Sequence, residues 1–169
     1  MFAAMKSRRL GITAVAGGAL VLGLSLSGCS LLDGGGPARD PSGTVTATST
    51  SDAFQIKVGD CIQDPGGTSV TDVVSVPCSQ PHDYEAFDRT LMKDGDYPGK
   101  QAVTDQADAY CEPAFEKFVG VKTEDSVLNM TYFFPTEESW KADDREILCL
   151  IAGEKEGVKV TGSLKGAKK

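Results

Sequence analysis

Four cysteines in the later part of the chain constrain its fold more than any other feature. They stand at positions Cys61, Cys78, Cys111 and Cys149, and the fifth cysteine, Cys29, lies apart from them. Four cysteines allow three pairings, and each pairing would make a different set of segments neighbours. Whether they pair at all depends on the compartment, because disulfides persist in exported proteins and are rare in the cytosol.

The start of the chain indicates export. The first nine residues carry three basic side chains and no acid, and an apolar stretch follows from Leu10 to Leu26. This order is typical of a secretory signal peptide. Residues 26–29 read L-S-G-C, which resembles the lipobox of bacterial lipoproteins. We therefore expect a signal peptide over residues 1–28 and a Cys29 that becomes the lipidated N-terminus, with palmitate among its acyl chains.

This interpretation places the mature protein on the extracytoplasmic face of the cell membrane, anchored by lipid. An uncleaved membrane helix is the alternative, although the apolar stretch would only just span a bilayer. The pair Arg8-Arg9 also leaves both general and twin-arginine export open.

Two disulfides are the expected outcome once Cys29 is assigned to lipid, because the remaining number is even and the compartment is oxidising. Of the three pairings we favour Cys61 with Cys78, which would close adjacent strands, and Cys111 with Cys149, which would pin a helix to a late strand. A zinc site is disfavoured because no C-x-x-C pair is present and the spacings are not those of zinc modules. We expect neither a metal nor another cofactor.

The exported part divides into a linker, a domain and a tail. Residues 29–52 are rich in Gly, Ser, Thr and Pro, so we expect a lipidated flexible linker that could extend to roughly 75 Å. Residues 53–166 suffice for one domain, and 167–169 form a basic tail. Without residues 1–28 the chain has 14 Lys and Arg against 24 Asp and Glu, a net charge of −10. Such acidity argues against nucleic acid as a partner.

Hydrophobic patterning predicts an α+β fold with a mostly antiparallel sheet, one principal helix and two disulfides. The helix is expected over Lys100–Val119, ending at Gly120, with Pro113 kinking or dividing it near Cys111. Thr136 is expected to cap a short helical turn. Alternating or β-branched stretches predict strands at 54–58, 68–76, 83–92, 128–134, 147–152 and, at an edge, 158–161.

The only histidine invites a catalytic interpretation, because His82 follows Cys78 by four residues and precedes Asp83. Cysteine, histidine and acid could serve nucleophilic catalysis. An oxidised Cys78 is no nucleophile, however, and no G-x-S-x-G elbow supplies a serine. We therefore expect no catalytic residue and regard His82 and Asp83 as possible ligand contacts.

A second group of candidates surrounds Trp140, where paired carboxylates flank an aromatic ring. Such a group could hold a sugar by stacking and hydrogen bonding. A tryptophan folded into the core beside solvated acids is the interpretation we favour, with Arg145 in an ion pair with Asp144. Trp140 and Arg145 remain possible ligand contacts.

Several short motifs occur in a fixed order between residues 56 and 166. They are V-G-D-C at 58–61, V-P-C-S-Q-P-H-D at 76–83, F-V-G at 118–120 after the cysteine-bearing helix, S-W and D-R within 139–145, Cys149, and T-G-S-L-K-G at 161–166. Together they resemble the septum formation domain of actinobacterial membrane proteins and lipoproteins, over about Ile56 to Gly166. Where the family pattern suggests Gly-Asp-Arg, this chain has Asp143-Asp144-Arg145.

The resemblance implies an envelope protein linked to septation and cell division, with no established catalytic residue to transfer to this chain. We expect a lipid-anchored, non-enzymatic module that binds a divisome or other envelope protein, or peptidoglycan. The alternative is a hydrolase directed at the cell wall that uses His82 with nearby acids.

Overall fold

A computed structural model of the chain describes residues 36–67 and 70–169, which fall within one compact unit. The expected signal peptide (1–28), the lipidation site at Cys29 and the start of the linker up to residue 35 lie outside the described residues. In chain order the elements are β1 (Ser49–Asp52), a 3₁₀ helix (Ala53–Gln55), β2 (Cys61–Ile62), β3 (Asp72–Val76), β4 (Tyr84–Leu91), α1 (Lys100–Val119), a second 3₁₀ helix (Thr123–Asp125), β5 (Asn129–Phe133), α2 (Glu137–Lys141) and β6 (Glu146–Ala152).

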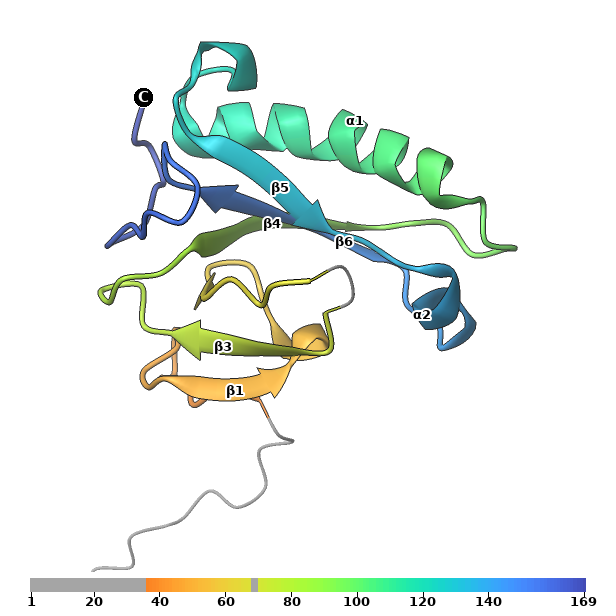
Figure 1. The fold of residues 1–169 in the computed structure, drawn as a ribbon, viewed down its shortest axis with the longest axis horizontal. Coiled ribbons are helices and arrows are strands. Elements are labelled where there is room, and N and C mark those ends of the chain that lie inside the picture. Colours follow the sequence, from red (N-terminus) through yellow and green to blue (C-terminus); the bar gives the residue numbers. More distant parts are fainter. Residues whose placement is uncertain (1–35, 68–69) are drawn as a thin grey trace, which may run out of the picture. The chain divides into compact units, whose positions relative to one another are not determined.

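The strands form one curled antiparallel sheet in the order β1-β3-β2-β4-β6-β5. In Figure 1, β5 and β1 are the two margins, and α1 runs alongside the β4-β6-β5 part. β6 inserts between β4 and β5, although β5 precedes it in the chain. The α+β class with one principal helix and two disulfides is thus confirmed.

Side chains alternate between the two faces of a strand, and both faces of β6 are buried. Ile147, Cys149 and Ile151 pack against α1 in the larger core cluster. Leu148 and Leu150 point to the opposite face, where the smaller cluster gathers under the curl of the sheet. This double burial explains the continuous apolar sequence of the strand.

α1 presents its apolar residues at helical spacing, among them Val103, Ala107 and Cys111, to the larger cluster. It ends at Gly120, whose φ of 91° is the left-handed conformation that favours glycine. Of the two outcomes expected at Pro113, a kink or a division, the division is wrong, since the helix runs unbroken. Pro113 lies on the exposed side, so water can satisfy the carbonyl that lacks its backbone donor.

The two disulfides confirm the favoured pairing. Cys61, at the start of β2, is bonded to Cys78 just after β3, with Cα atoms 5.1 Å apart. Cys111 of α1 is bonded to Cys149 of β6, with Cα atoms 5.6 Å apart. The second bond fastens the helix to the centre of the sheet.

Residues 36–52 fold against the domain, which corrects the expected flexible linker over this range. Arg39 and Val45 form a backbone bridge, and β1 pairs with β3. The Arg39 guanidinium binds the Asp60 carboxylate through two contacts of 2.5 and 2.6 Å. This segment is held by a buried ion pair and by backbone pairing. It can therefore dock without the alternating apolar residues from which a strand is usually predicted.

Two further strand expectations are corrected. Ala53–Gln55 form a 3₁₀ helix capped by Asp52, so no strand covers 54–58. Phe54 and Val58 are exposed, and only Ile56 between them is buried. Near the C-terminus, Val160 makes a single bridge to His82 rather than a strand at 158–161.

The last residues dock on the C-terminal end of α1. Gly166 N donates to Phe118 O at 2.7 Å, and Lys168 N donates to Val119 O at 3.0 Å. These carbonyls have no partner within the helix, and a basic tail suits the negative end of its dipole.

Candidate functional site

His82 is a buried residue two positions before the long strand β4. Its backbone exchanges two hydrogen bonds of 2.9 Å with Val160, and its side chain has no exposed surface. Nδ1 lies 2.8 Å from the Gln80 carbonyl oxygen, which can only accept, so Nδ1 carries the proton and donates. Nε2 has no hydrogen-bond partner among the described residues. The imidazole therefore faces the protein interior rather than a substrate.

Asp83 points to a surface recess instead. Its carboxylate accepts a hydrogen bond from Asp64 N at 2.8 Å and another from Lys159 Nζ. Burial disfavours the charged form, but the Lys159 ammonium and the Asp64 N–H outweigh it and hold the pKa of Asp83 below its usual value. The residue is thus an anion at neutral pH, already paired with one cation.

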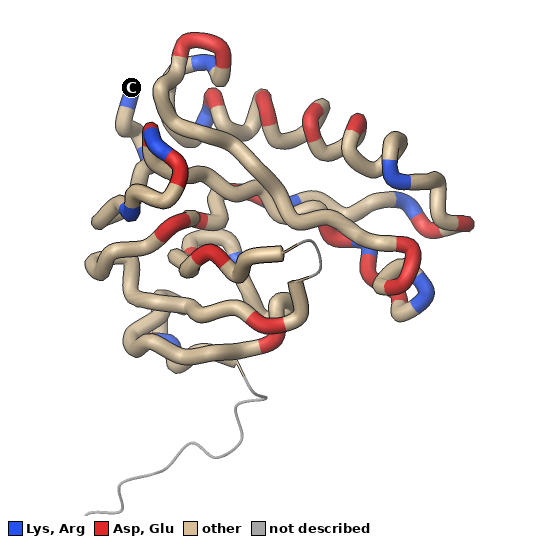
Figure 2. Tube along the Cα trace, in the orientation of Figure 1, with Lys and Arg blue, Asp and Glu red and all other residues tan. Residues whose placement is uncertain are grey.

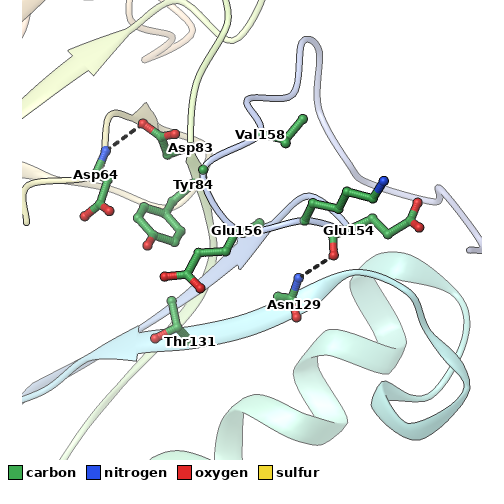
Figure 3. Close-up of a pocket in the computed structure, with 11 residues that line it drawn as sticks. Asp64, Asp83, Tyr84, Asn129, Thr131, Glu154, Glu156 and Val158 are labelled. Carbon is green, nitrogen blue, oxygen red and sulfur yellow. Dashed lines mark hydrogen bonds between the residues drawn. The ribbon is translucent and has the colours of Figure 1, made fainter.

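The recess is a pocket of about 330 Å³ beside Asp83 (Figure 3). Its floor is a cross-strand row in which Tyr84, Ala152 and Asn129 are register partners on β4, β6 and β5. The loop after β6 forms a wall, which Asn129 Nδ2 holds by donating to Gly153 O at 2.7 Å. The full lining is Asp64, Asp83, Tyr84, Asn129, Thr131, Ala152, Glu154, Lys155, Glu156, Gly157 and Val158.

Negative charge dominates this pocket. Burial, followed by the charges of Asp64, Asp83 and Glu156, raises the pKa of the Tyr84 hydroxyl. In the part of the chain that the structure describes, no three metal-ligating side chains gather in a way that could hold an ion. The carboxylates, the Thr131 hydroxyl and the aromatic ring suit a ligand that offers hydrogen-bond donors and positive charge.

Trp140 and Arg145 lie at the other end of β4. The Trp140 ring is buried and its Nε1 donates to Gly95 O at 2.8 Å. The Arg145 guanidinium carbon is 3.9 Å from the ring centroid. Its Nη1 donates to the carbonyls of Trp140 and Asp144, and its Nε is 3.4 Å from Asp94 Oδ1.

This geometry refines the expectations for the tryptophan region. Trp140 belongs to the core cluster, as favoured, and Thr136 caps α2. The expected ion pair of Arg145 with Asp144 is wrong, because the Asp144 carboxylate accepts from Ser139 Oγ and Glu146 N. A second hollow of about 360 Å³ lies beside Arg145 and is flanked by exposed Phe54 and Leu91.

The four expected ligand contacts therefore do not form one site. Tyr84 pairs with Ala152 and Leu91 with Glu146, so the two groups stand at opposite ends of an eight-residue strand, roughly 20 Å apart. Of the four, only Asp83 lines the acidic pocket. The other principal lining residues, such as Tyr84 and Glu156, carry no motif, and only the folded sheet brings them together.

Comparison with known proteins gives one result. A protein family model described as "Septum formation" matches residues 28–169. No curated protein and no solved structure matches the chain. Among the described residues, none of the helices is long and apolar enough to cross a bilayer.

Proposed function

The chain belongs to the septum formation family, and from this premise we propose that it is a lipid-anchored, non-enzymatic binding module on the outer face of the cell membrane. Family membership indicates a role in cell division and the cell envelope. The proposal adds the anchor, the mode of action by binding, and a partner that is an envelope protein or a wall component.

The pocket beside Asp83 is the observation that carries the binding proposal. It offers several oxygen acceptors and an aromatic ring to solvent, whereas the imidazole of His82 is buried one residue away. Both described disulfides close the thiols that could act as nucleophiles. This combination favours recognition of a partner over cleavage of one.

The anchor would hold the domain close to the bilayer. Lipidation at Cys29 leaves six residues before Gly36, where the described structure begins, and the seven Cα–Cα steps from Cys29 to Gly36 reach at most about 25 Å. The flexible linker first expected would have reached three times as far. Partners within this shorter distance are membrane proteins and the innermost wall.

Site-specific crosslinking in dividing cells tests the proposal. A photoreactive residue at Glu156, in the wall of the pocket, is expected to capture a protein or a glycan-bearing wall fragment. The same residue at Asp72, exposed on β3, is the control position. Asp64→Asn with a lipobox-intact chain should weaken capture from position 156. Equal capture from both positions, or none from 156, would count against a partner at this pocket.

The hydrolase alternative draws on His82, whose Nε2 has no hydrogen-bond partner among the described residues and whose neighbour Asp83 lines an acidic pocket. It predicts that the purified domain releases soluble fragments from isolated cell wall and that His82→Gln abolishes release. We expect no release by either form, with the two forms compared at equal folded concentration by circular dichroism.

A further inference from the structure

β5 is a margin of the sheet whose outer side has no partner strand. It pairs only with β6, and no backbone hydrogen bond from another described segment reaches residues 129–133. An edge strand presents unpaired N–H and C=O groups at every second residue. An extended segment of another chain can add there as a further strand.

The usual obstacles to strand addition are missing from β5. Its sequence, Asn-Met-Thr-Tyr-Phe, has no charged residue and no proline, and its pairing with β6 runs without a register shift. The opposite margin differs. β1 ends in Asp52, directly across from Asp72 of β3, so two like charges face each other there.

An acidic stripe follows the open margin. Between residues 101 and 116, α1 has four acids, Asp105, Asp108, Glu112 and Glu116, and no Lys or Arg. All four are exposed, and at 100° per residue they fall within an arc of about 80°. Figure 2 shows red segments recurring along this helix.

The position of Tyr110 shows which way the stripe faces. Its hydroxyl donates to Arg89 O of β4 at 2.8 Å, so this side of α1 faces β4. At 100° per residue the centre of the stripe lies roughly 160° around the helix from Tyr110, on the side away from β4 and toward β5. In agreement, burial and then the neighbouring Asp108 and Asp105 raise the pKa of Tyr132 of β5 to about 12.

The spacing of the stripe matches that of a strand. Residues four apart on a helix rise about 6 Å, and residues two apart on a strand rise about 6.7 Å. A strand added outside β5 would therefore place alternate side chains opposite Asp108, Glu112 and Glu116 in turn. Its intervening side chains would point to the other face, where Asn129 and Thr131 line the acidic pocket.

We propose that β5 is a docking edge for an extended, cationic protein segment, which adds as a seventh strand and sets alternate Lys or Arg residues against the acidic stripe of α1. This inference rests on the proposed binding function and specifies one partner surface for it. A second copy of the chain is disfavoured as the occupant because its own stripe would bring like charges together.

Peptide binding to the exported domain, residues 30–169 with both disulfides formed, tests the inference. The probe is a nine-residue peptide in which lysine alternates with threonine and valine. We expect binding that weakens with salt, together with slowed hydrogen exchange at the outward amides of residues 129–133. The same peptide with glutamate in place of lysine should not bind.

Two matched double variants distinguish an effect of the acidic stripe on α1 from an effect of the net negative charge of the domain. Glu112→Gln with Glu116→Gln is expected to weaken binding at least about fivefold. Asp52→Asn with Asp72→Asn removes the same charge from the opposite margin and should leave binding unchanged. Equal losses in the two double variants would overturn the stripe as the recognition element.

N-methylated peptides test main-chain pairing without changing the protein. Methylation of one alternating set of peptide nitrogens should abolish binding, because those N–H groups would donate to β5, and methylation of the other set should not. Equal binding of both methylated peptides would overturn strand addition. So would a dimer of the free domain whose amide protection maps to β5.

These outcomes are distinct from those of the pocket experiment. Peptide binding at β5 without capture from position 156 in cells would discard the pocket partner and retain the edge. Capture from 156 without peptide binding would do the reverse.

Discussion

The ion pair between Arg39 and Asp60 provides the sharpest test of how the N-terminal segment is held. The two side chains are 13% and 2% exposed, and the guanidinium spans both carboxylate oxygens. Removing one partner of a buried ion pair leaves the other charge without compensation, which costs about 3–5 kcal/mol. We therefore expect Arg39→Met to lower the free energy of unfolding by that amount.

A double variant that also removes the charge of Asp60 should recover part of the lost stability. Asp60 Oδ2 also accepts from Lys57 N at 2.8 Å, and asparagine keeps that acceptor without the charge. Arg39→Met combined with Asp60→Asn should therefore be less destabilised than Arg39→Met alone. The difference would measure the penalty of a buried unpaired carboxylate.

Urea unfolding of the disulfide-bonded domain, residues 30–169, is the assay, with thermal unfolding as a second measure. A loss of 3–5 kcal/mol corresponds to a fall of roughly 10–20 °C in Tm for a domain of this size. Limited proteolysis should then cut between Asp40 and Thr48 in Arg39→Met before it cuts elsewhere. A loss below about 1 kcal/mol with unchanged proteolysis would refute the docked segment and restore the flexible linker.

Three further predictions concern the rest of the domain. Replacing Cys111 and Cys149 together by alanine should cost about 4 kcal/mol, against about 3 kcal/mol for the other disulfide with its shorter loop, measured by urea unfolding; equal costs would contradict the loop-length argument. Asp143→Gly should raise the free energy of unfolding by about 0.5–1 kcal/mol in the same assay. Asp143 has a φ of 65°, which favours glycine, and it follows the C-terminus of α2, where a negative charge is unfavourable. A loss of stability would instead reveal a favourable contact of its carboxylate. The pKa of Asp83 is lowered in the folded state, so its charged form contributes stability above the unfolded pKa of 3.8, and this stability is lost as pH falls through the folded pKa. Asp83→Asn should therefore reduce the fall in the free energy of unfolding at acidic pH. An unchanged fall would refute the pairing of Asp83 with Lys159.

Elements with a strong local pattern were predictable. α1 and the strands β4, β5 and β6 follow from helical spacing or apolar runs, and the bond between Cys111 of α1 and Cys149 of β6 joins two of these elements. β1 was missed because Ser-Thr-Ser-Asp has no apolar residue and becomes a strand only by pairing with β3. β2 has two residues, too few for any periodicity.

The candidate site was predictable only at Asp83. Tyr84 and Asn129 meet because β6 inserts between their strands, an order that neither segment encodes locally. Burial likewise separated His82 from Asp83, although they are adjacent in the chain. The same long-range pairing leaves β5 at the margin beside the acids of α1.

Residue patterns alone were therefore enough to predict an even set of paired cysteines, the main helix and the family resemblance, because each can be recognised from short stretches of sequence. Folding decided which acids surround a pocket, which strand keeps a free edge, and where the N-terminal segment docks. These features depend on sheet order and on contacts between residues distant in sequence, so the composition of a local segment does not predict them.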